Sequence, residues 1–555
     1  MVPMYRLFCL RPCCRRLKDK TLHFDTMKKI LLALSVLLSL NMQARVEPEL
    51  NKHVSKLYTT LYLLSEMYVD SVDNKQMVDE AIDAMIKELD PHSDYMTAEE
   101  VAEMNEPLQG GFDGIGISFN MMNDTLFIVE VIVGGPSEKV GLQAGDRIMK
   151  VNGENIAGVK MSSKEVMKRL KGPKGTKVEV SVKRRNQKEW IDFTIVRDKI
   201  PMYSLDAAFM LSRNIGYIKI SRFGATTMDE YYEAFKELQA QGMKQLILDL
   251  RSNGGGYMST AISLADEFLG KGSCIVYTEG LHSPRQEAMA SDKGDFEEGN
   301  LVVLIDEFSA SSSEIVSGAV QDWDRGLIVG RRSFGKGLVQ RMLPLSDGTV
   351  IKLTVSRYHT PSGRCIQKPY DGGEEAYGKD LIDRYNRGEM ISADSIHFPD
   401  SLKYSTLVKC RAVYGGGGIM PDVFVPMDTT RFTPLHRLLV NRGILNRFAL
   451  SYVDDHRSDL KTKYPQAEDF IDKYEVSDEM IADMIALAEA EKVKIKDEDR
   501  NSDKTVLKLQ TKAYMARDLY KTAAYYQVMA PENEALQKAL EILNSAKLRK
   551  EYGLK

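Results

Sequence analysis

Hydrophobic residues follow a helical period at both ends of the chain and a mixed pattern between them. Over residues 49–107 they recur every three or four positions, as at Leu57 and Leu61, which indicates helices. Asp90, followed by Pro91, should end this helical stretch, because the residue before a proline avoids the helical backbone conformation. The N-terminal part of the chain is therefore predicted to be helical.

A glycine-rich stretch at residues 110–116 marks the change to β structure. It leads into an alternating strand, and a β-branched strand follows at 126–133. A short helix over 163–170 and two more strands, over 178–182 and 190–196, complete the unit. Many strands with a single good helix predict a small β-rich domain.

From residue 214 onwards, strands alternate with helices. Such a pattern is typical of a buried sheet with helices packed on it. Residues 370–405 are charged and irregular and look like an insertion, and helical spacing resumes after Pro434 and continues to the end. Strands are expected at 215–220, 245–250, 301–305 and 327–329, and helices at 228–241 and 314–321.

The length of the chain agrees with these changes of pattern, since 555 residues are too many for one core and predict two to four domains. We predict a multidomain α/β protein in which the α/β core carries an inserted β-rich domain and helical N- and C-terminal segments. The expected parts are a leader over 1–44, a helical segment over 45–107, the β-rich domain over 108–198, the core over 199–435 and a helical extension over 436–555.

Composition and charge exclude several classes of protein. Hydrophobic residues make up 43% and charged residues 28%, as in ordinary soluble proteins, and a net charge of −4 does not favour nucleic acid as a partner. The leader cysteines at 9, 13 and 14 lack a second ligand pair, so no metal site and no cofactor are expected. Three cysteines follow the leader and allow at most one internal disulfide: Cys274, Cys365 and Cys410.

The leader has the three-part layout of a secretory signal. Met27 and two lysines precede an apolar run over 30–40, and Ala44 offers a small residue at a cleavage point. We therefore expect the natural start to be Met27 and the protein to be exported, to the periplasm of a bacterial envelope. The alternative is an uncleaved anchor, the only case in which membrane association is expected.

The first candidate for chemistry is a serine-rich turn between an apolar strand and a helix. A serine there is held at the edge of the sheet, where the helix N-terminus favours the negative charge of an alkoxide. The plain alternative is that Ser311 or Ser313 merely caps the helix, since serine is a good N-cap residue. The turn reads Phe308-Ser309-Ala310-Ser311-Ser312-Ser313-Glu314.

A nucleophilic serine needs a base, and no histidine of the chain falls in a recognisable triad spacing. Lys336 lies between two glycines, which allow close backbone approach, and a lysine in an apolar pocket loses its charge more easily. A Gly-Lys-Gly sequence is more often a surface turn. It also mimics part of a phosphate-binding loop, but the glycine and Ser/Thr spacing of that loop is absent.

A third candidate is the glycine run that follows the strand predicted at 245–250. Glycines after a strand can direct backbone N–H groups at one point, which is one way to build an oxyanion hole. A flexible turn is the plain alternative. The segment reads Leu248-Asp249-Leu250-Arg251-Ser252-Asn253-Gly254-Gly255-Gly256.

Together these three segments resemble blocks of the C-terminal processing, or tail-specific, peptidase family. Further blocks that resemble the family lie at 89–93, 354–364 and 417–422, so the resemblance runs from about residue 50 to 430 and leaves the last 120 residues or so uncovered. The resemblance implies a crotonase-like α/β core, and it implies that Ser311 is the nucleophile, Lys336 the general base and Gln340 the residue that orients the lysine.

The same resemblance implies oxyanion donors in the backbone N–H groups of Ser312 and of Gly255 or Gly256. Two positions depart from the family pattern: Ser312 stands where alanine is usual, and Gly254 where proline is usual. The first should be harmless if only the N–H is used. The second leaves the choice between the two glycines open.

The β-rich unit resembles a PDZ domain, because it combines a Gly-Ile-Gly-Ile loop with the segment Ala144-Gly145-Asp146-Arg147-Ile148. In a PDZ domain such a loop presents N–H groups to the terminal carboxylate of a peptide, which adds as a strand. Without the second segment, these glycines would more often mark a hairpin. The implied peptide-binding residues are Gly114, Ile115, Gly116 and Ile117.

We therefore predict an exported serine endopeptidase that captures accessible C-terminal tails of proteins or peptides and cleaves them through an acyl-enzyme. One alternative is a non-catalytic PDZ scaffold on a peptidase-like fold, against which the joint presence of Ser311, Lys336 and Gln340 argues. Another is a crotonase-like hydrolase of small substrates, against which the PDZ domain argues. The sequence does not indicate an oligomeric state.

Overall fold

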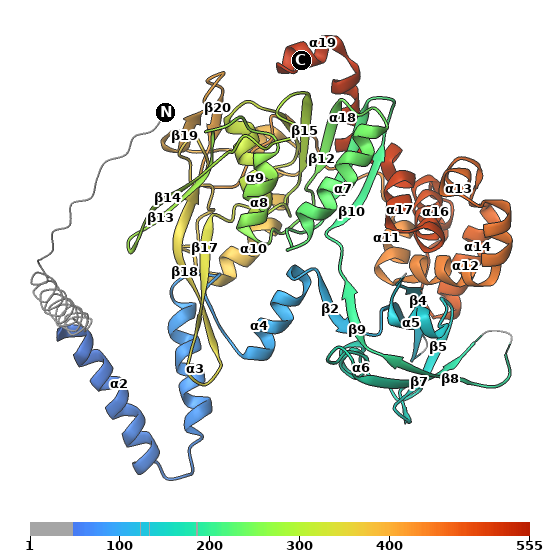
Figure 1. The fold of residues 1–555 in the computed structure, drawn as a ribbon, viewed down its shortest axis with the longest axis horizontal. Helices are drawn as coiled ribbons and strands as arrows, with labels where there is room; N and C mark the ends of the chain where they lie inside the picture. The colour runs from blue at the N-terminus through green and yellow to red at the C-terminus, as the bar shows by residue number, and fades with distance from the viewer. Residues whose placement is uncertain (1–47, 123, 133, 185–186) are drawn as a thin grey trace, which may run out of the picture. The chain divides into compact units, whose positions relative to one another are not determined.

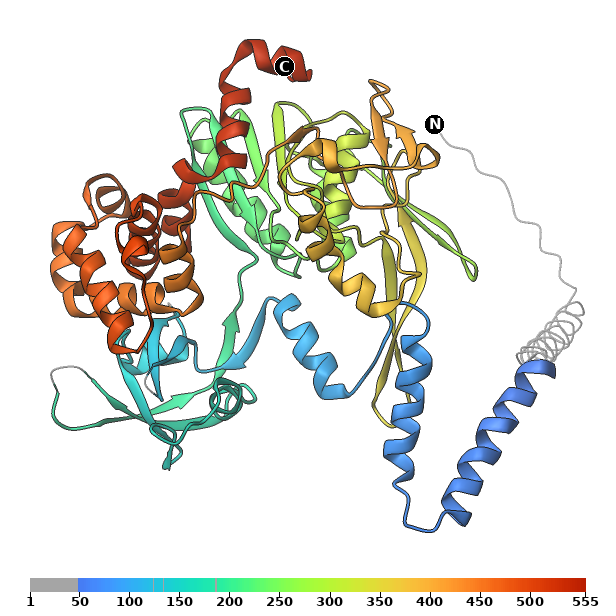
Figure 2. The same ribbon diagram turned by 180° about the vertical axis from the view of Figure 1, so that it is seen from behind.

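A computed structural model describes residues 48–122, 124–132, 134–184 and 187–555 (Figures 1 and 2). The predicted signal segment lies outside these residues. The chain divides into two compact units after Ala84, a division that falls inside the predicted helical segment 45–107. The first unit contains α2 (Pro48–Met67) and most of α3 (Asn74–Lys87).

The second unit begins with elements that lead into the predicted PDZ domain. They are β1 (Asp94–Met96), α4 (Ala98–Asn105) and the 3₁₀ helix η1 (Glu106–Leu108). β2 (Gly111–Gly114) then pairs antiparallel with β9 (Asp198–Pro201), so the two connections of the domain run side by side. The two ends of the domain are therefore joined to each other by one pair of strands.

The PDZ region is a small sheet whose strands follow the order β3-β4-β5-β7-β8, with β6 paired to β5. Alternate residues of these strands pack with Val166 and Leu170 of α6, which begins and ends where the sequence predicts. The elements are β3 (Ile117–Met122), β4 (Thr125–Val131), α5 (Pro136–Val140), β5 (Arg147–Val151), β6 (Glu154–Asn155), α6 (Ser163–Leu170), β7 (Lys177–Lys183) and β8 (Ile191–Val196).

The core contains a six-stranded sheet in the order β10-β11-β12-β15-β16-β21. All its pairings are parallel except that of β10 with β11, so the carboxyl ends of β12 and β15 meet at one edge. The strands are β10 (Leu205–Met210), β11 (Ile215–Ile220), β12 (Gln245–Asp249), β15 (Asn300–Ile305), β16 (Leu327–Gly330) and β21 (Val423–Phe424).

Helices cover both faces of this sheet, which explains why its central strands are buried throughout and mostly apolar (Figure 1). On β12, Leu246 and Leu248 pack with α7, α8 and α9, whereas Ile247 faces the C-terminal helix α18. The helix layer on the face of the sheet that carries Ile247 therefore comes from the C-terminal helical region. The helices are α7 (Thr227–Ala240), α8 (Met258–Asp266), α9 (Ser312–Asp322) and α18 (Glu534–Asn544).

A second sheet of the core carries the segment that follows Lys336. Its order is β1-β18-β13-β14, and β17 pairs with the other edge of β18. The strands are β13 (Cys274–Gly280), β14 (Ser283–Met289), β17 (Leu338–Pro344) and β18 (Val350–His359).

The segment 370–405 differs from the sequence prediction. It contains a 14-residue helix, α10 (Gly373–Asn386), and the short helices η2 (Ala393–Ser395) and η3 (Asp400–Leu402). The hydrophobic pattern did not indicate this helix, because the buried face of α10 includes an arginine, Arg384, where an apolar residue would be expected. A short hairpin of β19 (Lys403–Ser405) and β20 (Ala412–Tyr414) follows.

Helical structure resumes at Pro434, as the sequence predicts, and forms a separate apolar cluster. Across the described ranges no helix is both long and apolar enough to cross a membrane. The remaining helices are α11 (Pro434–Asn441), α12 (Ile444–Lys463), α13 (Ala467–Lys473), α14 (Asp478–Ala490), α15 (Asp497–Arg500), α16 (Thr505–Tyr520), α17 (Thr522–Met529), η4 (Ala530–Glu532) and α19 (Ala546–Tyr552).

Candidate active site

Ser311 lies at the carboxyl edge of the parallel sheet, in the turn between β15 and α9. Its φ of 54° and ψ of −111° form a backbone conformation that residues other than glycine rarely adopt. Asp306 accepts a hydrogen bond of 2.8 Å from the N–H of Ser252, and Ser309 Oγ donates to the Leu250 carbonyl at 2.9 Å. The serine turn is thus held by the neighbouring turn, which keeps Ser311 in its strained conformation.

Asn253 locks this neighbouring turn, residues 252–256, against the serine turn. Its side chain is fully buried. Its backbone carbonyl accepts hydrogen bonds from the N–H of Ala310 at 3.0 Å and from Ser313 Oγ at 2.9 Å. Ser313, one of the two serines that might merely cap the helix, therefore has a structural role. The two turns form one rigid unit.

The predicted oxyanion donors lie where the two turns meet. A Cβ on Gly255 would lie 2.8 Å from the Cβ of Ser311, so only glycine fits there. The Gly255 N–H donates to the Asn253 side chain at 2.9 Å, whereas the N–H groups of Gly256 and Ser312 have no partner among the described residues. Ser312 Oγ donates to the Gly256 carbonyl at 3.1 Å, so this departure from the family pattern adds a contact between the turns.

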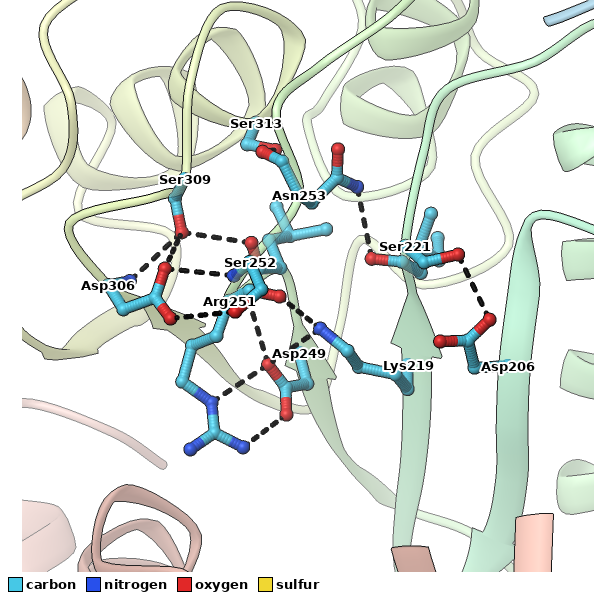
Figure 3. Close-up of polar contacts among 12 residues, drawn as sticks. Asp206, Lys219, Ser221, Asp249, Arg251, Ser252, Asn253, Asp306, Ser309 and Ser313 are labelled. Atoms are coloured by element: carbon cyan, nitrogen blue, oxygen red, sulfur yellow. Dashed lines mark hydrogen bonds and ion pairs between the residues drawn. The ribbon is translucent and has the colours of Figure 1, made fainter. Parts of the chain in front are cut away.

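A cluster of buried charges lies beneath the glycine turn (Figure 3). Arg251 contacts Asp249 at 3.0 Å from Nε and 2.5 Å from Nη2, and Lys219 Nζ lies 3.5 Å from the same carboxylate. Burial raises the pKa of Asp249, but the charges of Arg251 and Lys219 outweigh it and hold that pKa well below its usual value. Arg251 also donates to Asn533 of the C-terminal region at 2.7 Å, which braces the turn from behind.

Glu314, in the first turn of α9, links the serine turn to the loop of Lys336. Its carboxylate is fully buried. One oxygen accepts from the N–H groups of Ser311 (2.8 Å) and Lys336 (2.9 Å), and the other from Gly335 N–H (2.7 Å) and Ser333 Oγ (2.5 Å). Burial raises the pKa of Glu314 to about 7, although these four hydrogen bonds favour the ionised form. The sequence analysis gave Glu314 no role.

Lys336 lies in the loop before β17 and is largely removed from solvent. Burial lowers the pKa of its ammonium, and the positive charge of Lys352 lowers it further, whereas Glu314 and Asp90 oppose the change. A lysine whose pKa is lowered is neutral more often at physiological pH, which a general base requires. The environment of Lys336 therefore agrees with the predicted role.

The structure brings Ser311 and Lys336 together through their backbones. Tyr358 Oη lies 3.2 Å from the carbonyl oxygen of Ser311 and 2.5 Å from that of Lys336. Within the described residues, Ser311 Oγ and Lys336 Nζ form no hydrogen bond with each other. The links between the two residues that the structure shows run through their backbone groups, by way of Tyr358 and Glu314.

Gln340, the third predicted catalytic residue, contacts a different partner. Its Nε2 donates to Thr354 Oγ1 at 3.1 Å, and Thr354 Oγ1 donates to Asp90 at 3.1 Å. Its role in orienting Lys336 stays a prediction.

The turn at 90–93 is also part of this site, although the sequence analysis gave its residues no role there. Asp90 accepts from the N–H groups of His92 (2.8 Å) and Ser93 (2.9 Å). Burial, together with the charge of Lys336, lowers the pKa of His92 to about 4, so this histidine is neutral at physiological pH. The only sequence signal was the match of 89–93 to a family block.

The predicted carboxylate-binding loop leads into a strand with a free edge. Gly114 ends β2, Ile117 begins β3, and the carbonyls of Ile115 and Gly116 each accept a backbone hydrogen bond of 3.0 Å. Within the described residues β3 pairs only with β4, so its other edge is open to an added strand. Val166 of α6 belongs to the same apolar cluster as Ile117.

The described part of the chain holds no group of three or more His, Cys, Asp or Glu side chains that could bind a metal ion. Cys274, Cys365 and Cys410 are free thiols.

Four family profiles match consecutive parts of the chain. Peptidase family S41 matches residues 214–373, and the PDZ domain matches 114–195. The N-terminal domain of the activating protease CtpB matches 29–100, and a family of unknown function, DUF8443, matches 435–521.

Individual proteins with similar sequences carry consistent names. A carboxy-terminal-processing protease of Bartonella bacilliformis is 37% identical over 305 residues, which are 54% of this chain and 69% of that protein. The carboxy-terminal processing protease CtpA of Bacillus subtilis is 36% identical over 302 residues, 54% of this chain and 64% of that protein. Among solved structures, the photosystem II D1 C-terminal processing protease is 26% identical with a TM-score of 0.36, covering 67% of this chain and 86% of that one.

Proposed function

The chain belongs to peptidase family S41, as a carboxy-terminal processing protease with a PDZ domain, and we propose that it is an exported endopeptidase with a Ser311–Lys336 dyad. The observation that supports the dyad most is the Glu314 carboxylate, which accepts hydrogen bonds from the N–H groups of both residues. It fixes the nucleophile and the base relative to each other. A PDZ scaffold without catalysis would not need that link.

In the proposed reaction, neutral Lys336 takes the proton of Ser311 Oγ as the oxygen attacks the scissile carbonyl. A change in the Lys336 side chain precedes this step, because Nζ is not hydrogen bonded to Oγ in this structure. The N–H groups of Ser312 and Gly256 stabilise the oxyanion, with the N-terminus of α9 behind them. Lys336 then protonates the leaving amine. In the second half of the reaction, neutral Lys336 takes a proton from water as the water attacks the acyl-enzyme, and returns that proton to Ser311 Oγ as the ester bond breaks.

The proposed substrates are proteins or peptides with accessible C-terminal tails. The tail would add as a strand along β3, and the N–H groups of the loop 114–117 would bind its carboxylate. We include in this proposal the crotonase-like character of the core and the export signal in residues 27–44. Gly256 replaces Gly255 as the preferred oxyanion donor, because Gly255 N–H already donates to Asn253.

The decisive experiment compares the protein with its Ser311→Ala variant on two unfolded polypeptides that differ only in an apolar or a charged C-terminal tail. We expect cleavage of the apolar-tailed polypeptide by the unmodified protein alone. With a serine-directed fluorophosphonate we expect a phosphonyl adduct on Ser311, formed as its oxygen displaces fluoride. Equal cleavage by both proteins would contradict the dyad. Tail binding without cleavage by either would favour the scaffold.

A further inference from the structure

The loop at residues 332–337, here called the base loop, holds Lys336 without regular secondary structure of its own. Its backbone groups must therefore find partners elsewhere, since buried N–H and C=O groups are costly when unpaired. Glu314 takes two of its N–H groups, and Tyr358 contacts the carbonyl of Lys336. These contacts leave the carbonyls at the start of the loop to be accounted for.

Arg384 supplies those contacts from helix α10. Its Nη2 donates to the Arg332 carbonyl at 2.7 Å, and its Nη1 donates to the Ser333 carbonyl at 3.0 Å. The side chain is 1% exposed, and burial lowers its pKa to about 10, so it is still charged at neutral pH. Burying a guanidinium costs free energy, and here two loop carbonyls, rather than a close carboxylate, accept its hydrogen bonds. Such an arrangement is expected where the position of the loop matters for function. The nearest carboxylate, Glu389, lies 3.6 Å from Nε.

Tyr377, about two turns earlier on α10, supports the other end of the base loop. Its Oη lies 3.4 Å from Nε2 of Gln367, whose Oε1 accepts from the N–H of Gly337 at 2.7 Å. The same Oη lies 2.8 Å from Nε2 of His92. One helix therefore contacts both ends of the base loop and the 90–93 turn beside it.

Lys368 makes further contacts between α10 and the base loop. Its N–H donates to the Gly335 carbonyl at 2.9 Å, and its Nζ lies over the rings of Phe334 (4.2 Å) and Tyr377 (4.0 Å). Nζ also donates to Asp380 of α10 at 2.9 Å. The helix and the base loop are thus joined by packing as well as by hydrogen bonds.

We propose that α10, in the segment with no assigned role, is a cradle that sets the position of the base loop, and that Arg384 and Tyr377 are positioning residues for Lys336. The inference rests on the proposed function of Lys336. Neither residue touches substrate; each acts through the loop backbone. A loop that moves by about 1 Å can cost 10²-fold in rate, which gives the scale of the expected effect.

A structural role alone would lower the amount of folded protein, so the test measures more than activity. In the cradle, burial keeps Lys336 neutral more often, and the groups that face it are Lys352 on β18, Glu314 on α9, and Asp90 and His92 in the turn at 90–93. If the loop loosens, water reaches Lys336 and its pKa rises. The acid limb of the kcat–pH profile should then move to higher pH.

The experiment uses Arg384→Ala, Arg384→Lys and Tyr377→Phe in the full chain, with Lys379→Ala as the matched control. Lys379 is an exposed cation on the same helix and pairs with Glu375. For both Arg384 variants we expect kcat about 10–100-fold lower with KM nearly unchanged, an acid limb at higher pH, and partial rescue of Arg384→Ala by added guanidinium. Lys379→Ala should keep the normal profile.

Tyr377→Phe keeps the ring and should fold even if the Arg384 variants do not, with a kcat about 3–10-fold lower and the same direction of shift. Rates are expressed per active site titrated with the fluorophosphonate. If every folded variant keeps the normal kcat and pH profile, the cradle is refuted. If Ser311→Ala retains activity, the proposed dyad fails instead, whichever result the α10 variants give.

Discussion

Two glycine turns of this protein are each predicted to bind an oxygen anion through backbone N–H groups, yet they are built differently. The turn at 252–256 lies on the buried charges of Asp249 and Arg251, and Asn253 within the turn donates from its side chain to the Ile220 carbonyl (Figure 3). The loop at 114–117 is held by backbone hydrogen bonds and by packing in a small sheet. One turn is fixed from every side, and the other borders an open strand edge.

The difference follows from what each turn must do. Stabilising an oxyanion in a transition state requires donors that do not reorganise, because reorganisation adds to the barrier. Capturing a tail requires an edge that accepts different side chains, and backbone pairing supplies the affinity. Changes near the turn at 252–256 should therefore alter kcat. Changes in the PDZ region should alter KM, or the balance between an inhibited and an active arrangement if the region gates the site.

The largest effect should come from Ser311→Ala. Removal of the nucleophile should lower kcat/KM by about 10⁴-fold or more. The melting temperature should move by only a few degrees, because Ser311 is the N-cap of α9 and the loss of a cap costs only about 1 kcal/mol. Peptide cleavage and thermal unfolding measured on the same preparation check both parts, and a normal rate would rule out this nucleophile.

Lys336→Arg should be as inactive as Lys336→Ala, because arginine keeps the charge but does not deprotonate at working pH. In the unmodified protein, kcat should rise with pH as Lys336, with its lowered pKa, becomes neutral. His92 should not cause this rise, since its pKa is about 4 and it is already neutral. Kinetics from pH 5 to 10 on the lysine variants and on His92→Asn test this. Substantial activity in Lys336→Arg would transfer the base role to another group.

Glu314→Gln should lower kcat about 10–100-fold, because an amide NH₂ would face N–H groups that now donate to a carboxylate. The acid limb should move to lower pH, since the negative charge that favours protonated Lys336 is gone. Stability should also change. A folded-state pKa of about 7 against an ordinary 4.5 means that the native protein holds the proton longer, so stability falls as pH rises between those values.

Urea unfolding at pH 4.5 and pH 7 measures the part of this prediction that concerns stability. The difference between the two pH values should shrink in Glu314→Gln. Glu307→Gln, a change at a buried carboxylate that pairs with Arg331 instead, is the matched control and should keep the kcat–pH profile. An unchanged profile in Glu314→Gln would mean that Glu314 does not act on Lys336.

The sequence predicted the strands of the core well because they are buried on both faces and mostly apolar. The predicted strand at 215–220 is confirmed residue for residue, and the strand predicted at 301–305 starts one residue earlier, at Asn300. Both patterns are local. The helix α10 was missed because its buried face contains a charged residue, Arg384, whose hydrogen-bond partners lie more than 50 residues away in the chain.

The candidate site was predictable only as far as local motifs extend. Ser311 and Lys336 stand in segments that resemble family blocks, and the structure places their backbones together. Glu314 stood in the same segment without a role, because its four donors come from residues up to 22 positions away. The contact of Gln340 with Thr354 depends on strand pairing, which no motif indicated.

A smaller effect should follow from removal of the PDZ region, residues 109–197, with a short flexible linker in its place. If the region only tethers substrate, saturating cleavage of a short peptide that needs no tail capture should be unchanged. We expect it to change several-fold, because the paired β2 and β9 hold the region beside the core at both ends. A rise would identify an inhibitory gate and a fall an activator, whereas an unchanged saturating rate would refute gating.

The smallest effect concerns the ion pairs between α4 and the PDZ helix α6. Glu99 pairs with Lys168 at 3.2 Å, and Glu103 pairs with Lys164 at 3.3 Å. Exposed pairs contribute little each and weaken with salt, so reversal of the two lysines to glutamate should change the peptide rate only about two- to five-fold. Reversal of the two glutamates as well should restore the pairs and the rate. The salt dependence of cleavage should be flatter in the lysine variant and return in the fourfold variant. If the fourfold variant behaves like the lysine variant, these ion pairs do not set the position of the PDZ region. The turn at 252–256 and the loop at 114–117 would then not be coupled through them.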